Sequence, residues 1–420
     1  MAREMKDSGI EWIGEIGFDF YMMKLKYVSI ILDQFRKPVT ADQRNQEGEK
    51  LYDYYGASGV IDKINDYTID DHVMLIGEDG ANLKMRNLPL MYEVNGKAWV
   101  NNHAHILKPK QNIDFYYLYY VLEALDINPY ITGSAQPKLN QENLKNIWIP
   151  VPDASIQKEI VCYIKDACME IDNVLEKTRT SIEEYKKLKQ AVITQAVTKG
   201  IKGDREMKNS GIEWIGEIPI EWEERRIKTL FNLREEKNYS PLEEVNLISL
   251  YTDLGVVQHS ELEKTTGNKA SNADGYKMVY KDDIVVNIIL CWMGAIGRSE
   301  YEGVTSPAYD IYIPQNEVLS KFYHYYFRTK GFSGDCYKRG RGIMAMRWRT
   351  YSDQFRDIRV VYPSMEEQRE IADYLDQKCL AIDELIAKKE QYIFEIENYK
   401  KSLIYEYVTG KKEVPLEHKA

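Results

Sequence analysis

Two segments of this chain, 202 positions apart, share thirteen of fourteen residues. The segment 3–16 reads REMKDSGIEWIGEI and the segment 205–218 reads REMKNSGIEWIGEI. A second set of matches lies 211 positions apart and begins with Pro152 and Pro363. The sequences between these repeated blocks show no comparable match. A repeated frame with unrelated inserts predicts two copies of one scaffold, related by a pseudo-twofold axis, that present two different domains.

The length of 420 residues exceeds one ordinary domain, and the repeat divides the chain near residue 204. No run approaches the roughly 20 apolar residues of a membrane helix. The first residues, MAREMKDSGIEW, lack the apolar core of a signal peptide. We therefore expect a cytoplasmic protein with no membrane partner.

The net charge of -10 argues against a free-standing nucleic-acid binder, because phosphate contacts usually need a basic face. The segment 336–349 (CYKRGRGIMAMRWR), however, has five basic residues and no acidic one. Weak intrinsic affinity, completed by basic partner subunits, would reconcile the two observations. The five cysteines lack the CxxC spacing of a zinc site, so neither a disulfide framework nor a structural metal is predicted.

Two long amphipathic helices are predicted over 153–200 and 364–410. Apolar residues recur there at intervals of three and four, with no proline or glycine inside the periodic stretch. A proline stands just before each stretch and a glycine at its end, where these residues suit a helix start and stop. A helix of roughly 40 residues spans about 60 Å and cannot bury its apolar stripe on one small domain.

We therefore predict that the two helices pair as an antiparallel coiled coil. The alternative is that each helix folds onto its own half. Pseudo-twofold symmetry also predicts that the 3–16 segment lies near the end of the second helix. The predicted seam residues are Ile160, Ile164, Ile171, Val174, Ile182, Leu188, Val192, Ile371, Leu375, Ile382, Leu385, Ile393, Tyr399 and Leu403.

The two intervening segments have a mixed texture, rich in Tyr, Val and Ile with Gly, Asn and Asp between short runs. Alternating runs at 90–102 and 280–290 predict strands, and shorter helices are predicted from Asp114 and from Lys321. The predicted fold class is α+β: two globular mixed α/β domains joined by the two long helices. The predicted division is 1–152 for the first domain, 201–363 for the second and 411–420 for a tail.

Several motifs in order give the chain a family resemblance. These are the repeated SGIEWIGEI box, WVNNHAHIL at 99–107, GSAQPKLNQENL at 133–144, GAIG followed by SPAYDIY at 306–312, and P-x-x-x-x-Q-x-E-I at each helix entry. Over nearly its whole length the chain resembles the specificity subunit of type I restriction-modification systems. One departure is local: the second box continues with Pro219 and Trp222, whereas the first has Gly17 and Phe20.

The resemblance implies that the two inserts are target recognition domains, each reading half of a split double-stranded DNA sequence. It further implies that the helices are spacers that dock two modification (methyltransferase) subunits, and that restriction (translocase/nuclease) subunits join the complex. The chain itself is then not an enzyme. S-adenosylmethionine, ATP and Mg are expected on the partner subunits and no cofactor on this chain.

The residues support a chain without catalysis of its own. Asn128-Pro129-Tyr130 lacks the second proline of an amino-methyltransferase motif and is interpreted as a turn, and no glycine-rich cofactor fingerprint or Walker lysine motif occurs. His103 and His105 have metal-like spacing, but nothing nearby completes a coordination sphere, so packing histidines are favoured. A free-standing methyltransferase or nuclease, and a coiled-coil adaptor that never contacts DNA, are the alternative functions.

Candidate DNA contacts are basic and amide side chains, since arginine bonds guanine or phosphate. Arg339 and Arg341 flank Gly340, which predicts an exposed loop that could reach a groove. Arg347 to Arg349 resembles a shared family motif and is expected to position backbone or pack internally. The candidates are Lys338, Arg339, Arg341, Arg347 and Arg349 in the second domain, and Lys84, Arg86, Gln136 and Lys138 in the first.

Overall fold

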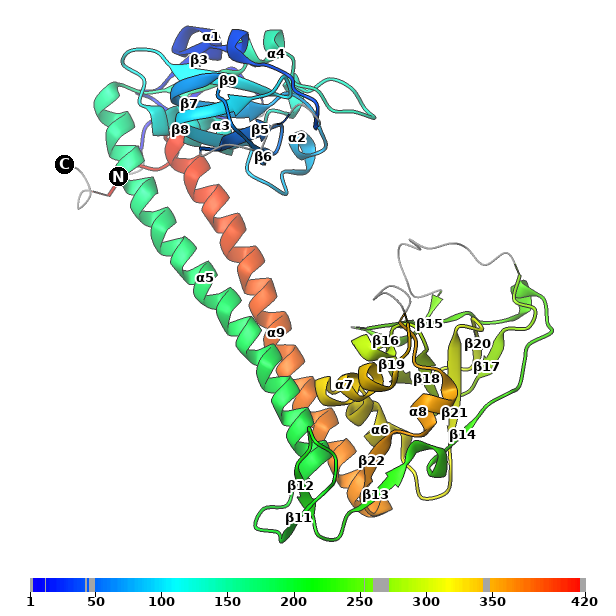
Figure 1. Cartoon of the computed structure of the whole chain (residues 1–420). Coiled ribbons are helices and arrows are strands. Elements are labelled where there is room, and N and C mark those ends of the chain that lie inside the picture. Colours follow the sequence, from blue (N-terminus) through cyan, green and yellow to red (C-terminus); the bar gives the residue numbers. More distant parts are fainter. Residues whose placement is uncertain are drawn as a thin grey trace. The chain divides into compact units, whose positions relative to one another are not determined.

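The computed structural model describes residues 3–11, 13–41, 44, 50–252, 254–259, 272–342 and 348–415. The chain forms two compact units. One unit takes the chain up to Arg179 and from Glu390 onward, and the other is Thr180–Lys389. Each unit therefore consists of one globular domain, the first part of one long helix and the last part of the other (Figure 1).

The first domain is built on a six-stranded sheet in the order β4-β9-β7-β8-β5-β6. Neighbouring strands are antiparallel except for the parallel pair β5 and β8. Its strands are β1 (Met5–Asp7), β2 (Glu15–Gly17), β3 (Tyr21–Lys24), β4 (Ser29–Ile31), β5 (Tyr52–Gly56), β6 (Gly59–Ile64), β7 (Ile69–Gly77), β8 (Met91–Val100), β9 (Ala104–Pro109) and β10 (Trp148–Val151). Its shorter helices are α1 (Leu25–Val28), α2 (Asn82–Met85), α3 (Phe115–Ala124) and α4 (Gln141–Lys145).

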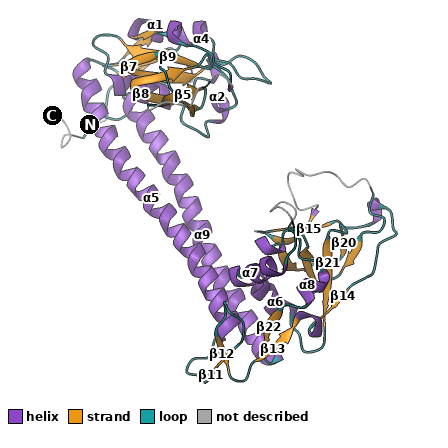
Figure 2. Cartoon of the chain, in the orientation of Figure 1, coloured by secondary structure: helices purple, strands orange, loops and turns teal. Residues whose placement is uncertain are grey.

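The second domain has a four-stranded antiparallel sheet in the order β14-β21-β18-β19 and four two-stranded pairs (Figure 2). Its strands are β11 (Met207–Asn209), β12 (Glu217–Pro219), β13 (Glu223–Arg226), β14 (Phe231–Leu233), β15 (Ile248–Tyr251), β16 (Gly255–Gln258), β17 (Lys277–Val279), β18 (Ile284–Asn287), β19 (Ile296–Arg298), β20 (Gly303–Thr305), β21 (Tyr309–Pro314) and β22 (Arg359–Tyr362). Its shorter helices are α6 (Ser320–Phe327), α7 (Lys330–Arg339) and α8 (Ser352–Arg356). The strands and short helices predicted from the sequence are thus present as β8, β18, α3, α6 and α7.

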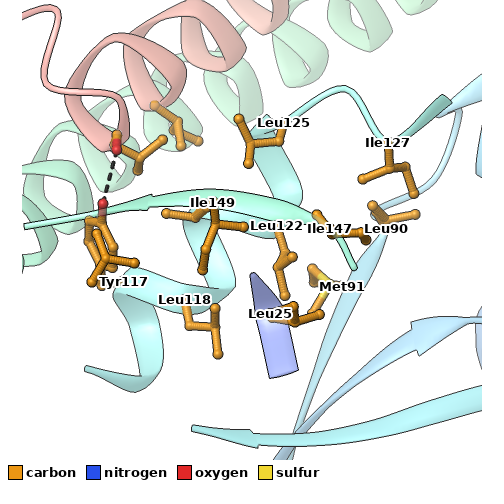
Figure 3. Packing of buried hydrophobic residues seen from close by; sticks show 14 of the residues in the cluster. Leu25, Leu90, Met91, Tyr117, Leu118, Leu122, Leu125, Ile127, Ile147 and Ile149 are labelled. Atoms are coloured by element: carbon orange, nitrogen blue, oxygen red, sulfur yellow. Dashed lines mark hydrogen bonds between the residues drawn. The ribbon is translucent and has the colours of Figure 1, made fainter. Parts of the chain in front are cut away.

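The core of the first unit joins its domain to both long helices. Helix α3 begins at the N-cap Asp114, whose carboxylate accepts hydrogen bonds from the Tyr116 and Tyr117 N–H groups. Behind this cap the Tyr117 ring is buried, and its hydroxyl donates to the carbonyls of Pro150 and Val408, both at 2.9 Å (Figure 3). The end of the second long helix is therefore part of the first domain's core.

The repeated boxes form equivalent hairpins, β1–β2 and β11–β12, each followed by a strand pair, β3–β10 and β13–β22. Phe20 and Trp222 are both fully buried, so the smaller ring occupies the equivalent place in the first box. The Arg3 guanidinium lies 5.1 Å from the centre of the Phe20 ring. In the second box the Trp222 Nε1–H instead donates to Glu367, at 2.8 Å.

The first box meets the end of the second long helix, as pseudo-twofold symmetry predicts. The Gly17 N–H donates to the carbonyl of Thr409 at 3.1 Å, and the Arg3 guanidinium donates to the carbonyl of Lys412 at 3.3 Å. In the second unit the Lys199 ammonium donates to the carbonyl of Ile215 at 3.1 Å, so the first helix ends on the second box.

The long helices are α5 (Ala154–Lys199) and α9 (Met365–Val408), within two residues of the predicted bounds. They are antiparallel in each unit. In the first unit Asp172 and Arg179 of α5 pair with Lys400 and Glu397 of α9. In the second unit Tyr185 and Lys189 of α5 contact Lys389 and Asp383 of α9 in the same opposed order.

Four of the predicted seam residues are wrong. Val174, Leu188, Leu385 and Tyr399 are exposed, because they lie outside the strip that faces the partner helix or the domain core. The buried predictions are Ile160, Ile164, Ile182, Ile371, Leu375, Ile382 and Leu403, while Ile171, Val192 and Ile393 are half-buried. The strip also contains residues that the prediction omitted, including Leu175, Ile193 and Ile404.

Candidate nucleic-acid interface

Each domain carries one loop directly before its last short helix. We call these the 132–138 loop, which precedes α4, and the 341–349 loop, which precedes α8. Thr132 and Lys138 exchange two backbone hydrogen bonds at 2.8 Å, and Arg341 and Arg349 do the same at 2.8 and 3.0 Å. Each loop is therefore closed at its base by one antiparallel bridge.

The ends of the two loops occupy the same position in the fold although the loop sequences are unrelated. The residue after each closing position donates its N–H just beyond the end of the central strand: Leu139 to the carbonyl of Glu78 at 2.7 Å, and Thr350 to the carbonyl of Ile288 at 2.9 Å. Strands β7 and β18, which precede these carbonyls, pair in the same way with β9 and β21. The closing residues Lys138 and Arg349 are thus equivalent, and both are basic.

In the first domain the candidate side chains of this loop face solvent. Gln136 is exposed, and the half-exposed Lys138 ammonium lies 3.2 Å from Glu78. Gly133 has a φ of +81°, and a Cβ there would lie 2.4 Å from the Gln136 carbonyl oxygen. The loop therefore needs glycine at this turn.

The other two first-domain candidates differ from each other. Lys84, on α2, is exposed. Arg86 ends α2 with a φ of +53°, and its guanidinium donates to the carbonyls of Glu123 and Leu125 at the end of α3. Through these contacts Arg86 joins α2 to α3.

In the second domain the basic candidates surround the end of α7. The Lys338 ammonium lies 2.5 Å from Glu213, and the Arg339 guanidinium lies 3.7 Å from Asp357. Arg341 is exposed and Arg349 is half-buried. Arg347 lies outside the described residues.

An aromatic pair lies beside the base of the 341–349 loop. The Trp348 ring stacks on Tyr337, with ring centres 5.0 Å apart, and its Nε1–H donates to the Tyr337 carbonyl at 3.1 Å. A Cβ on Gly340 would lie 2.2 Å from Trp348 Nε1. Trp348 therefore packs the loop against the last turn of α7.

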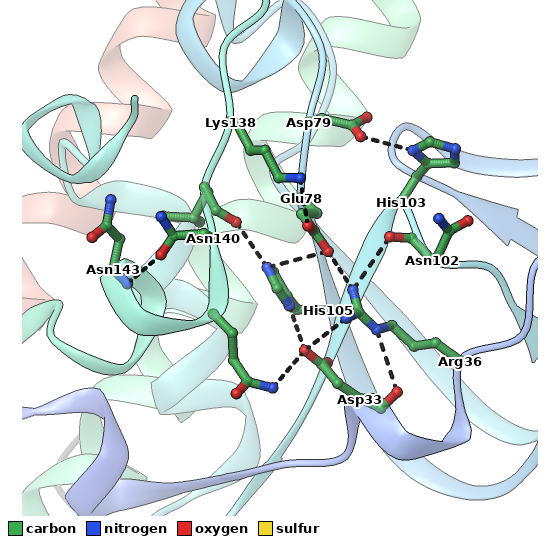
Figure 4. A network of polar contacts seen from close by, with 12 residues as sticks. Asp33, Arg36, Glu78, Asp79, Asn102, His103, His105, Lys138, Asn140 and Asn143 are labelled. Atoms are coloured by element: carbon green, nitrogen blue, oxygen red, sulfur yellow. Dashed lines mark hydrogen bonds and ion pairs between the residues drawn. The ribbon is translucent and has the colours of Figure 1, made fainter. Parts of the chain in front are cut away.

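A polar network lies under the 132–138 loop and joins two of the sequence motifs (Figure 4). His105 is fully buried, and its Nδ1 and Nε2 lie 2.7 Å from Asp33 and 2.8 Å from the Leu139 carbonyl oxygen. The Gln141 amide donates to the same Asp33 carboxylate at 3.0 Å. Burial raises the pKa of Asp33, but hydrogen bonds from His105, Gln141 and the Ile106 N–H, with the His105 charge, bring it below its usual value.

The network continues through Glu78 to the surface. Burial raises the pKa of Glu78, but the Arg36 guanidinium and the Lys138 ammonium, with a further charge contribution from His105, lower it below its usual value. At the rim His103 pairs with Asp79 at 2.7 Å. Among the described residues no group of three or more possible metal ligands gathers. His105 has protein partners on both nitrogens.

The Asn128-Pro129-Tyr130 segment forms a short 3-10 turn, as the sequence interpretation proposed. The Tyr130 hydroxyl accepts a hydrogen bond from the Trp148 N–H at 3.1 Å. Its tyrosine is therefore part of the domain framework.

Exposed Tyr392 and Phe394 of α9 correspond to the polar Ser181 and Glu183 of α5, but the other large exposed apolar residues on the long helices occur in equivalent pairs. Each lies 211 positions from its counterpart, and the exposed fractions are similar within each pair. The pairs are Met169 (58%) with Leu380 (62%), Val174 (39%) with Leu385 (41%), and Leu188 (48%) with Tyr399 (58%). Large apolar side chains left in solvent at repeated positions indicate a surface for partners.

A groove also lies beside the final part of each long helix. In the second unit it has about 760 Å³ and is lined by Lys186, Gln190 and the box residue Trp214. In the first unit it has about 640 Å³ and is lined by Glu397 and Lys401, the equivalents of Lys186 and Gln190. The two grooves therefore share some equivalent helix positions, at which the side chains differ.

Sequence reasoning missed the residues that support both loops. Asp33, Glu78 and Gln141 lie far apart in the chain, and so do Lys277, Asp310 and Ser352 in the second domain. The motifs GSAQPKLNQENL and SPAYDIY, which carry Gln141 and Asp310, were the available signal. Their partners could be found only by folding the chain.

None of the described helices is long and apolar enough to cross a membrane.

Known proteins resemble the chain in sequence and in fold. The family model for the type I restriction modification DNA specificity domain matches residues 19–184 and 219–397, one match in each half. A putative type I restriction enzyme specificity subunit of Haemophilus influenzae is 26% identical over 385 residues, covering 90% of this chain and 89% of that protein. The putative MjaX specificity subunit of Methanocaldococcus jannaschii is 28% identical over 327 residues, covering 73% and 70%.

Solved structures share the fold at low sequence identity. A chain from a type I R-M system, described with its complex assembly and conformational transition, superposes with a TM-score of 0.69 at 11% identity, covering 94% of this chain and 99% of that one. The HsdS subunit of Thermoanaerobacter tengcongensis gives a TM-score of 0.51 at 12% identity, covering 94% and 98%. The duplicated family match, the internal repeat and the shared architecture agree, and the chain belongs to the type I restriction-modification DNA specificity subunits.

Proposed function

We propose that this chain reads a bipartite double-stranded DNA target, one half-site by each domain, for a type I restriction-modification enzyme. The observation that carries the proposal is the equivalent placement of the 132–138 and 341–349 loops. Both close on a basic residue, Lys138 or Arg349, and their sequences differ. Equivalent loops with different side chains suit the reading of two different half-sites, since basic and amide groups discriminate base edges in the major groove.

The contact residues in this proposal are the candidates that belong to these two loops. Gln136 and Lys138 would contact the first half-site, and Arg341, with Arg347 and Arg349, the second. Lys84, Lys338 and Arg339 are further candidates for phosphate contact, which fixes register without carrying sequence information. Arg86 contributes to the framework of α2 and α3.

Catalysis in this proposal belongs to partners. The long helices dock two modification subunits, which bind S-adenosylmethionine and extrude the target adenine from the duplex. Restriction subunits bring ATP, Mg and nuclease activity. A stoichiometry of two is supported by the exposed apolar pairs, because a partner surface repeated by the internal pseudo-symmetry occurs twice.

A domain exchange tests the reading function. Residues 17–150 are replaced by the matching segment of a relative with another target, the complex is expressed in cells, and methylated sites are mapped across the genome. One half-site should change while the other half-site and the modification chemistry remain. A change in both half-sites would contradict independent reading.

Methyl transfer by the purified chain with S-adenosylmethionine alone would favour a free-standing methyltransferase. DNA binding absent from the assembled complex would favour an adaptor. A methyl-donor binding assay on the isolated chain tests the first alternative, and a gel shift with the assembled complex tests the second.

A further inference from the structure

We propose that His105 in the first domain and Asp310 in the second are positioning residues for half-site specificity. Both are buried. His105 acts by holding the 132–138 loop in place, and Asp310 acts in the same way on the 341–349 loop. The inference rests on the proposed reading of DNA by these loops. It adds two residues that cannot contact DNA themselves.

The two residues occupy one position in the shared strand frame. Leu107 of β9 pairs with Ile31 and Met74, and Tyr312 of β21 pairs with the equivalent Leu233 and Ile284. Two residues earlier, His105 lies opposite Ile76 and Asp310 lies opposite Val286. The equivalence therefore comes from strand register.

In the first domain His105 joins the segment after the loop to the sheet. Its Nε2 donates to the carbonyl of Leu139 at 2.8 Å, one residue beyond the closing Lys138. Its Nδ1 lies 2.7 Å from Asp33, which also accepts from Gln141 at the start of α4. The buried His105 ring thus holds both the residue that follows the loop and, through Asp33, the start of α4.

In the second domain a carboxylate makes the equivalent connection. Asp310 is 5% exposed and accepts from the Ser352 hydroxyl at 2.6 Å, at the start of α8. Its other oxygen accepts from the Lys277 ammonium at 2.8 Å. Ser352 follows the closing Arg349 by three residues, as Gln141 follows Lys138.

These buried hydrogen bonds should determine how precisely the side chains of each loop are positioned. A side chain that reads a base edge must be held within about 0.5 Å, and buried hydrogen bonds behind the contact residues provide this. Beneath each loop one strand residue hydrogen-bonds to residues that follow the loop, while Gln136 and Arg341 are exposed. Loss of the buried bond should therefore relax base discrimination with little change in nonspecific phosphate attraction.

In the first domain two near-isosteric variants separate the bonds of His105. H105N keeps a donor near Asp33 and loses the bond to Leu139, whereas H105Q keeps a donor toward Leu139. The complex with the modification subunit is assayed by competition binding on DNA carrying single base changes in either half-site. H105N should lower discrimination in the first half-site about tenfold, the scale of one base contact, and leave the second within about twofold. H105Q should retain more of the discrimination in the first half-site than H105N does.

The control is His72, which lies on β7 at the end of that strand away from the residue paired with His105. His72 hydrogen-bonds to Glu93 at 2.8 Å and stacks on Phe115, so it is another histidine of the same sheet with a carboxylate partner. H72N should leave both half-sites unchanged. Thermal unfolding of all three variants shows whether an effect follows stability instead of position.

In the second domain S352A removes only the bond between Asp310 and α8. It should lower discrimination in the second half-site alone. D283N is the control, because buried Asp283 pairs with Arg234 at 2.9 Å beside the opposite end of β18. It should reduce stability without changing discrimination.

The outcomes are distinct. If the unmodified complex discriminates neither half-site, the proposed function fails. If it discriminates both, and H105N and H105Q leave the first half-site intact or relax it equally, the positioning role of His105 is overturned. An S352A complex with full second half-site discrimination overturns that of Asp310.

Discussion

Lys189 of α5 donates to both carboxylate oxygens of Asp383 of α9, at 2.7 and 2.6 Å. The equivalent pair, 211 positions along, is Lys400 with Asp172, at 2.6 and 2.7 Å. Each pair lies within its own unit, and each joins the two long helices. The internal repeat is therefore present in interhelical contacts as well as in the sequence.

Reversing one charge should weaken the helix pair slightly, because these partners are partly exposed. K189E is expected to lower the free energy of unfolding by about 0.5–1 kcal/mol, and the double variant K189E/D383K to recover most of it. Denaturant titration at low salt measures both. A double variant no more stable than the single one would show that the contact contributes nothing.

Breaking the buried pair of the second box should cost much more. Arg205 and Glu367 have side chains 13% and 8% exposed, and Glu367 also accepts from the Trp222 indole at 2.8 Å. E367A leaves the buried indole without its acceptor and leaves the guanidinium with only the exposed Glu221, so the free energy of unfolding should fall by about 3 kcal/mol. E370A is the control, because the Glu370 pair with Lys202 in the same turn is more exposed. Equal losses in the two variants would contradict the role of burial.

Gly133 should be required for the first half-site. G133A adds a Cβ at 2.4 Å from the Gln136 carbonyl oxygen and strains a φ of +81°, so the loop must shift and first half-site affinity should fall. Gly96 has a similar φ of +97° but nothing within 4 Å of its Cβ position. G96A therefore shares the backbone strain without the clash, at a cost of about 1–2 kcal/mol. Equal DNA binding by the two variants would count against the loop as the reader.

The second unit should lose stability in mild acid through His324. Burial, with the charges of Arg328 and Arg298, lowers the pKa of His324 to about 3, and its Nδ1 accepts from the Arg298 N–H at 3.1 Å. Between the ordinary value of 6.5 and about 3 the unfolded chain binds a proton that the folded chain does not. The free energy of unfolding should therefore decrease as the pH falls through this range.

The measurement compares wild type with H324N between pH 7 and pH 5 by denaturant titration. Asparagine can accept the same hydrogen bond without titrating, so the variant should show a shallower dependence of stability on pH. An unchanged slope would assign the acid sensitivity to other groups.

The sequence alone determined the duplicated frame, the two long helices and the class of both domains. These features depend on local signals: an exact offset between repeats, a three-and-four apolar spacing, and proline and glycine at the ends. Helix α5, predicted over 153–200, is found at Ala154–Lys199 for this reason. The exposed loop side chains Gln136 and Arg341 could likewise be proposed from composition alone.

Tertiary structure decided which residues face inward and which distant residues meet. Val174 and Leu175 are neighbours about 100° apart on the helix, and only packing against the partner helix and the domain leaves one exposed and buries the other. Asp33 and His105 are 72 positions apart, and the equivalence of His105 with Asp310 shows in strand register, not in residue type. The chain specifies its periodic elements locally, whereas its loops acquire their common position only when the strands of each sheet pair.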